Sequence, residues 1–409
     1  MNLHRSLAAS AAFALGACAT LSPEQPAIGD SKHSAALNQS GYRMFEALRD
    51  DTSAGENTFI SPLSIQQALG LVHPGARGET AAQIERLLGL PAGEGFEQAL
   101  EDQRLAVIGK VGKTEVKLAN ALWLGQQFGF NSDYLAVTRT RYAATAERLD
   151  FAGAPKASAD RINGWAKDKT NGLISNVIDP SGLGADTLAI LTNAVFFEGE
   201  WATAFNKASP EPFRFGDGQT RQFPLMGKTA AYSYAEADGW QAVRLPYVSD
   251  NRFAMDVFLP LKRSATAKLP AATFQKLTTA LGNAQPEAVA VMLPRFEIAW
   301  KQTLNDVLAR LGMSDAFVEG RADLSGMVSP ASRRPLISKV THLTRLQVFE
   351  TGTRAAAVTV VDIVVTGAPI NRPKVIRADQ PFHLALRETK SGNLLFVGRI
   401  AKPQIYSGN

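Results

Sequence analysis

Residues 350–366 form an alternating stretch of small, β-branched and charged side chains, which reads Glu350-Thr-Gly-Thr-Arg-Ala-Ala-Ala-Val-Thr-Val-Val-Asp-Ile-Val-Val-Thr366. Successive side chains of a strand point to opposite faces. As a strand, this stretch would place both of its internal charges, Arg354 and Asp362, on the same face. The opposite face would carry no charge and would consist of Thr353, Ala355, Ala357, Thr359, Val361 and Ile363. Such a pattern suits a strand in the middle of a sheet that covers a buried core.

The side chains of the same stretch are too small for a permanent core strand. Small Ala and Thr side chains follow Gly352, and they fill little volume in a packed interior. No proline interrupts the run before Pro369. We therefore predict a movable strand, which can enter a sheet and can also remain outside it.

Composition predicts one large domain. The chain has 409 residues, of which 45% are hydrophobic and 20% charged, and no linker-like segment divides its interior. Its net charge of +5 is scattered, without basic clusters interleaved with aromatic residues, which argues against a nucleic-acid partner. One cysteine and five histidines, without His-x-x-x-His or Cys-x-x-Cys spacing, argue against a disulfide framework and a structural zinc site. We expect no metal and no cofactor.

The N-terminus has the features of a targeting segment. Arg5 precedes an apolar run from Leu7 to Leu15, which is too short to span a bilayer permanently. Leu15-Gly-Ala-Cys18 resembles the lipobox of bacterial lipoproteins, and this resemblance implies a signal peptide over 1–17 and a lipidated tether over 18–33. By the same resemblance, acylation of Cys18 would anchor the chain in the bacterial cell envelope, and Ala19 in place of an aspartate implies sorting to the outer membrane, on its periplasmic or surface face. An ordinary secretory signal with an incidental cysteine is the alternative.

The body of the chain alternates between helical and strand-like patterns. Ser61-Pro62 is a typical helix start, and Gly89 a typical helix end. Helices are predicted over residues 35–49, 80–88, 161–170 and 304–311, and a further helix is predicted to begin at residue 61. Strands are predicted over 116–124, 188–197, 242–245, 253–259, 289–293, 347–350, 382–388 and 394–400. Helices dominate the first half and strands the second, which predicts an α+β fold with a large, mainly antiparallel sheet.

Several separated motifs resemble those of the serpins. They occur in the family's order, and the resemblance spans residues 34 to 403. It implies a serpin domain over 34–409, with helices packed around a large antiparallel sheet A, smaller sheets B and C and an exposed reactive-centre loop. The motifs are Asn57-Thr-Phe-Ile-Ser-Pro-Leu-Ser64, Gly75-Ala-Arg-Gly-Glu-Thr80, Leu191-Thr-Asn-Ala-Val-Phe-Phe-Glu-Gly-Glu-Trp201, Ala378-Asp-Gln-Pro-Phe382 and Phe396-Val-Gly-Arg-Ile400.

The resemblance assigns two groups of residues to the sheet. A polar cluster under the middle of sheet A, called the shutter in this family, corresponds to Ser61, Ser64, Asn193 and His342. Buried polar groups must pair with one another, and these pairs can rearrange when strands separate. A second region, the breach, is where insertion begins, and it corresponds to Trp201, Arg295 and Glu350. The pair of Arg295 and Glu350 would set the angle at which the loop enters.

The reactive loop follows from Glu350. Its hinge corresponds to Glu350, Gly352, Thr353, Ala355, Ala356, Ala357 and Thr359. Inhibitory serpins keep the inward positions of this segment small, and the uncharged face described above meets that demand. Arg354 replaces an acid that is common in the family, but on the outward face. The family's usual spacing from Glu350 places the scissile bond at Thr366-Gly367, with Val365-Thr366 as the nearest rival.

The resemblance implies an inhibitor that traps a protease covalently by inserting its cleaved loop into sheet A. Small residues from Val364 to Gly367 favour elastase-like or subtilisin-like serine proteases; a cysteine protease target stays open. A monomer is expected.

A non-inhibitory serpin, acting as a substrate or binding protein, is the alternative. An enzyme is the third interpretation, but no Gly-x-Ser-x-Gly, His-Glu-x-x-His or Gly-x-x-x-x-Gly-Lys-Ser/Thr motif is present.

Overall fold

The computed structural model describes residues 33–329, 335–353 and 372–405. Its helices are α1 Ser34–Asp51, α2 Pro62–Val72, α3 Gly78–Leu88, α4 Glu94–Val107, α5 Ser132–Tyr142, α6 Pro155–Lys169, α7 Ala271–Asn283 and α8 Asn305–Arg310. Its strands are β1 Thr58–Ile60, β2 Gly109–Val111, β3 Thr114–Gly125, β4 Thr145–Leu149, β5 Ala189–Glu200, β6 Ser209–Arg214, β7 Thr220–Ala237, β8 Trp240–Pro246, β9 Phe253–Pro260, β10 Glu287–Pro294, β11 Phe296–Thr303, β12 Thr341–Phe349, β13 Gly352–Thr353, β14 Lys374–Arg377, β15 Phe382–Glu388 and β16 Leu394–Ile400.

Helix ends follow the capping chemistry that the sequence predicts. The Ser61 hydroxyl accepts a hydrogen bond from the backbone N–H of Ser64 at 3.2 Å, and Pro62 opens α2. Gly89 ends α3 in the left-handed conformation, with φ of 68°. Both predicted helix boundaries are therefore confirmed.

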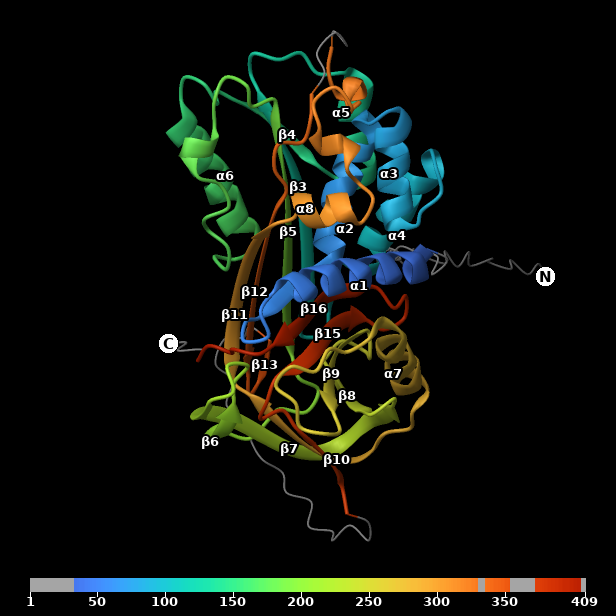
Figure 1. The fold of residues 1–409 in the computed structure, drawn as a ribbon, viewed down its shortest axis with the longest axis vertical. Coiled ribbons are helices and arrows are strands. Elements are labelled where there is room, and N and C mark those ends of the chain that lie inside the picture. Colours follow the sequence, from blue (N-terminus) through green and yellow to red (C-terminus); the bar gives the residue numbers. More distant parts are fainter. Residues whose placement is uncertain (1–32, 330–334, 354–371, 406–409) are drawn as a thin grey trace, which may run out of the picture.

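A seven-stranded sheet runs along the long axis of the molecule in the order β11-β12-β13-β5-β3-β2. β4 pairs with β3 in parallel, and the other pairs are antiparallel. The helix α6 lies on one side of this sheet and α2 on the other (Figure 1). The predicted large, mainly antiparallel sheet is confirmed.

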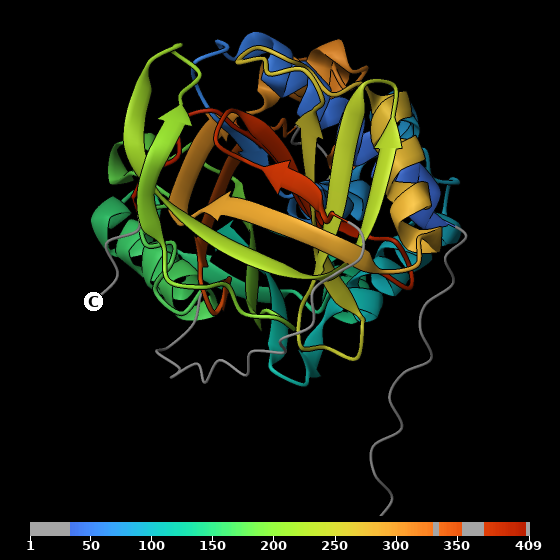
Figure 2. The same ribbon diagram turned by 90° about the horizontal axis from the view of Figure 1, so that it is seen from below.

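A nine-stranded sheet occupies one end of the molecule, in the order β1-β16-β15-β9-β8-β7-β10-β14, with β6 paired to β7. Figure 2 looks onto this end, where the strands curve around an apolar core. The 18-residue strand β7 takes part in two groups of pairs, because its residues 220–232 face β6 and β10 and its last residues, 233–237, face β8. The two smaller sheets expected from the family are thus joined through β7.

Several elements differ from the sequence prediction. β12 begins at Thr341, six positions before the predicted start at 347. Its first half alternates buried and half-buried side chains, and the half-buried Arg345 pairs with Glu297 of β11 at 2.8 Å. The buried face of this half carries the polar residues His342 and Thr344, so the apolar alternation expected of a strand is missing there. Local patterns in the sequence did not predict the helices α4, α5 and α7 or the strands β1, β2, β4, β6, β7, β11 and β14.

Candidate functional site

The movable stretch begins inside the seven-stranded sheet. Gly352 and Thr353 pair with Phe349 and Val348 of β12 on one side, and with β5 on the other. Thr353 is 1% exposed, so the first inward residue of the predicted hinge is buried between two strands of the sheet. A Cβ added to Gly352 would lie 2.2 Å from the carbonyl oxygen of Gly199. Gly352 is therefore required for the close approach of two strands.

The predicted breach residues meet around the turn that precedes β13. Trp201 donates its indole N–H to the carbonyl of Phe349 at 2.9 Å and its backbone N–H to that of Thr351 at 3.0 Å. The Glu350 carboxylate accepts a hydrogen bond from the backbone N–H of Ala208 at 3.0 Å and lies 3.8 Å from Arg295. These contacts hold the start of the loop to the end of β5.

Tyr247 belongs to the same region, and sequence reasoning missed it. Its hydroxyl lies 2.6 Å from the hydroxyl of Thr353, and its ring stacks on Trp201 with centroids 4.4 Å apart. The sequence offers only a weak signal for this role, an aromatic residue directly after the strand Trp240–Pro246. Since 106 positions separate Tyr247 from Thr353, no local pattern links them.

The predicted shutter residues divide into two groups. The backbone N–H of Ser61 donates to Nε2 of His342 at 3.0 Å, and Ser61 also caps α2 through Ser64. Burial lowers the pKa of His342 to about 3, so the ring is neutral and its lone pair can accept. Asn193 of β5 instead donates to the side-chain oxygen of Asn120 on β3 at 2.7 Å.

A cavity of about 610 Å³ separates these two groups. Asn193 of β5 and His342 of β12 both line it, and residues of α2 and α6 also contribute to its wall. Among the described pairs of strands, β5 and β12 meet only through the two residues of β13. Beyond β13, the facing edges of β5 and β12 therefore border a gap that is large enough to hold a chain segment.

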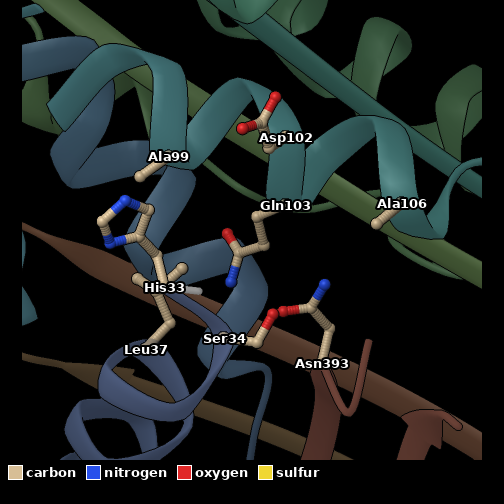
Figure 3. Close-up of a pocket in the computed structure, with 8 residues that line it drawn as sticks. All are labelled: His33, Ser34, Leu37, Ala99, Asp102, Gln103, Ala106 and Asn393. Atoms are coloured by element: carbon tan, nitrogen blue, oxygen red, sulfur yellow. The ribbon is translucent and has the colours of Figure 1, made fainter. Parts of the chain in front are cut away.

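A second cavity lies between the first turn of α1 and α4 (Figure 3). Its volume is about 10 Å³, which is room for one water molecule at most. Gln103, in its wall, donates to the side-chain oxygen of Gln66 at 2.6 Å. We assign this space to packing.

Part of the predicted site lies outside the described residues. This holds for the hinge residues Ala355, Ala356, Ala357 and Thr359, for the bond Thr366-Gly367 and for Cys18. Within 33–329, 335–353 and 372–405, no group of His, Cys, Asp and Glu side chains is arranged to hold a metal ion. In the same ranges, no helix is long and apolar enough to cross a membrane.

The comparisons with known proteins agree with this geometry. The chain is similar to an uncharacterized serpin-like protein of Thermococcus kodakarensis, with 32% identity over 90% of this chain and 85% of the relative. It is 34% identical to the leukocyte elastase inhibitor of Equus caballus, over 88% of this chain and 96% of the relative.

Solved structures and a family profile point the same way. The thermophilic serpin tengpin in its native state superposes with a TM-score of 0.78 and 27% identity, over 90% of this chain and 94% of tengpin. The profile of the family described as "Serpin (serine protease inhibitor)" matches residues 35–403. The chain therefore belongs to the serpin family.

Proposed function

We propose that this protein is a suicide-type inhibitor of serine proteases. The observation that carries the proposal is the position of β13, whose two residues pair with β12 on one side and β5 on the other. The cavity of about 610 Å³ continues the gap between the same two strands. The first residues of the movable stretch thus stand where a new central strand would begin.

The proposed reaction starts when a target protease accepts the loop as a substrate. The scissile peptide bond breaks, an ester forms between the protease nucleophile and the residue before that bond, and the new amine departs on the C-terminal segment. The hinge then inserts between β5 and β12 and carries the protease to the other end of the sheet. There, the distorted active site of the protease cannot complete hydrolysis.

The gap between β5 and β12 supplies the driving force in this proposal. Backbone N–H and C=O groups on a strand edge need partners, and an added strand provides them along both edges. The side-chain oxygen of Asn193 is buried at this edge without a hydrogen-bond partner among the described atoms. Insertion competes with deacylation of the protease, so an inhibitor needs a hinge that enters quickly.

Residues near the scissile bond indicate the target class. Val364, Val365, Thr366 and Gly367 offer small or β-branched side chains and no basic group. A trypsin-like pocket would leave its buried acid unpaired against such residues. The similarity to a leukocyte elastase inhibitor supports an elastase-like or subtilisin-like target. We place the scissile bond at Thr366-Gly367.

We further propose that the chain is a lipid-anchored monomer of the bacterial cell envelope. The lipobox-like tetrad that ends in Cys18, the only cysteine, supports this. Several acyl chains on one residue give stable anchorage where a single chain does not. Ala19 supports sorting to the outer membrane.

One experiment separates inhibition from the alternatives. The protein is incubated with a neutrophil-elastase-type protease and, in parallel, with trypsin as a specificity control. We expect an SDS-stable covalent complex with the elastase and little with trypsin. Clean cleavage without a complex, across elastase-like and subtilisin-like proteases, would show a substrate-type serpin and refute inhibition. Mass spectrometry of the released C-terminal fragment identifies the bond, since it begins at Gly367 or, for the rival bond, at Thr366.

A further inference from the structure

We propose that Tyr247 is the positioning residue that latches Thr353 into the seven-stranded sheet and thereby controls how readily the loop inserts. This inference rests on the inhibitory function proposed above. It assigns a role to a side chain outside the motifs that identify the family in this chain.

The contact joins two buried hydroxyl groups. The hydroxyl oxygens of Tyr247 and Thr353 lie 2.6 Å apart, and either group can be the donor. Both residues are 1% exposed. Burial raises the pKa of the Tyr247 hydroxyl, so the group stays a neutral phenol that can both donate and accept. The hydrogen bond is therefore shielded from competition by water.

The ring of Tyr247 has a fixed position. It stacks on Trp201 with an interplanar angle of 16°, and Phe197 packs against it at 4.8 Å and 63°. Since aromatic neighbours hold the ring, the hydroxyl position is set by the protein and not by the hinge. Thr353 can dock only where this hydroxyl already lies.

The backbone near Tyr247 is tied to β5, the strand that receives the hinge. Val248 donates its N–H to the carbonyl of Glu200 at 2.8 Å, and Gly199 is the partner of Thr353 in β5. A Cβ added to Gly199 would lie 2.9 Å from the ring carbon Cδ1 of Tyr247. The glycine thus makes room for the ring and the hinge at the same point, and the latch moves with β5.

Release of the hinge would leave the Tyr247 hydroxyl among aromatic rings without its partner. Loss of one typical buried hydrogen bond changes an equilibrium about five-fold. The contact is therefore strong enough to shift the balance between a docked and an undocked hinge, and weak enough not to lock it.

The first test needs no protease. Amide hydrogen exchange of the full chain is followed by mass spectrometry in peptides that contain 349–353. We expect Tyr247→Phe, which keeps the ring and removes the hydroxyl, to speed exchange there about five-fold. Tyr42→Phe is the matched control, because Tyr42 also loses a buried hydrogen bond, to the carbonyl of Leu269 at 2.9 Å, but in α1. It should leave exchange at 349–353 unchanged.

The second test measures inhibitor molecules consumed per trapped elastase-type protease. Tyr247→Phe and Thr353→Val should each raise this number, since slower docking lets more loops be cleaved as substrate. The double variant should consume no more inhibitor per trapped protease than either single variant, because both substitutions remove the same hydrogen bond. The Tyr42→Phe control should consume the same number of inhibitor molecules per trapped protease as the unaltered chain.

The two tests separate the possible failures. Unchanged exchange in Tyr247→Phe overturns the latch, whether or not a protease is trapped. Faster exchange with unchanged inhibitor consumption overturns its role in insertion. If the unaltered chain traps no protease, the inhibitory function fails and the link to insertion fails with it, while the exchange test still decides whether the contact holds the hinge.

Discussion

The backbone N–H of Ser61 and the ring nitrogen Nε2 of His342 form a hydrogen bond of 3.0 Å between residues 281 positions apart. This contact joins the start of α2 to the strand β12, at the edge of the gap that the loop would fill. It requires a neutral imidazole, because a ring nitrogen that carries a proton cannot accept. The state of one buried histidine is thereby coupled to the position of β12.

We predict that His342 makes the protein less stable in acid. Its folded pKa of about 3 lies below the ordinary value of 6.5, so the unfolded chain binds the proton first. This contribution to stability is complete above pH 6.5 and is lost at up to about 1.4 kcal/mol per pH unit as pH falls toward 3. His342→Gln, which can still accept, should show a shallower decline in urea midpoint between pH 6.5 and 4. If the urea midpoint of His342→Gln declined as steeply as that of the unaltered chain, His342 would not be the source of the acid sensitivity.

His73 should act in the opposite direction. It is buried between Glu97, at 2.7 Å from Nδ1, and Glu85, at 2.9 Å from Nε2. Burial opposes the charged ring, but hydrogen bonds to both carboxylates prevail and raise the pKa of His73. Its stabilising effect is therefore complete below the unfolded pKa of 6.5 and is lost as pH rises through the folded value. Glu97→Gln should flatten the stability profile above pH 6.5, as followed by urea unfolding, and an unchanged profile would refute the arrangement.

Thr353→Arg should convert an inhibitor into a substrate. The side chain is 1% exposed between β5 and β12, and a charge placed there has no partner at the paired residues Val348 and Gly199. Cleavage by an elastase-type protease should continue while the SDS-stable complex disappears. Thr140→Arg, on an exposed position of α5, serves as the control and should inhibit normally. Undiminished trapping by Thr353→Arg would disprove the register of the hinge.

Asp256→Ala should destabilise the fold by about 3 to 5 kcal/mol. The carboxylate is fully buried and binds Arg244 through two hydrogen bonds of 2.7 and 2.8 Å, while Arg387 lies 3.2 Å away. Burial lowers the pKa of Arg387 to about 10 even though the charge of Asp256 raises it, so removal of the acid leaves the buried Arg387 and the mostly buried Arg244 without their shared carboxylate. Asp160→Ala, which breaks the exposed pair with Lys156, should cost about 0 to 1 kcal/mol in the same urea titration. Equal losses in the two variants would contradict the prediction.

Cys18→Ala should release the protein from membranes. The variant lacks the only thiol that can carry an acyl chain, and the apolar run before it is too short to span a bilayer. When expressing bacteria are fractionated, the unaltered protein should be found in the membrane pellet and the Cys18→Ala variant in the soluble envelope fraction. Continued sedimentation with membranes would contradict lipidation.

Local chemistry made much of the fold predictable. The cap at Ser61, the glycine that ends α3 at Gly89 and the apolar character of β15 and β16 depend on neighbouring residues alone. Elements with weak local patterns were missed. In α5, for example, only Tyr134, Thr138 and Tyr142 are buried, so its helical periodicity is faint.

The sequence by itself determined the family, the helix ends at Ser61 and Gly89 and the small, uncharged residues at alternate positions from Thr353 to Ile363. Only the tertiary structure decided which polar groups pair: Tyr247 with Thr353, and Asn193 with Asn120 rather than with His342. Asp256 likewise meets Arg244 and Arg387 only because β8, β9 and β15 align in register. The physical reason is that hydrogen bonds and ion pairs act over a few ångströms, and distant strands reach that range only after the sheets have formed.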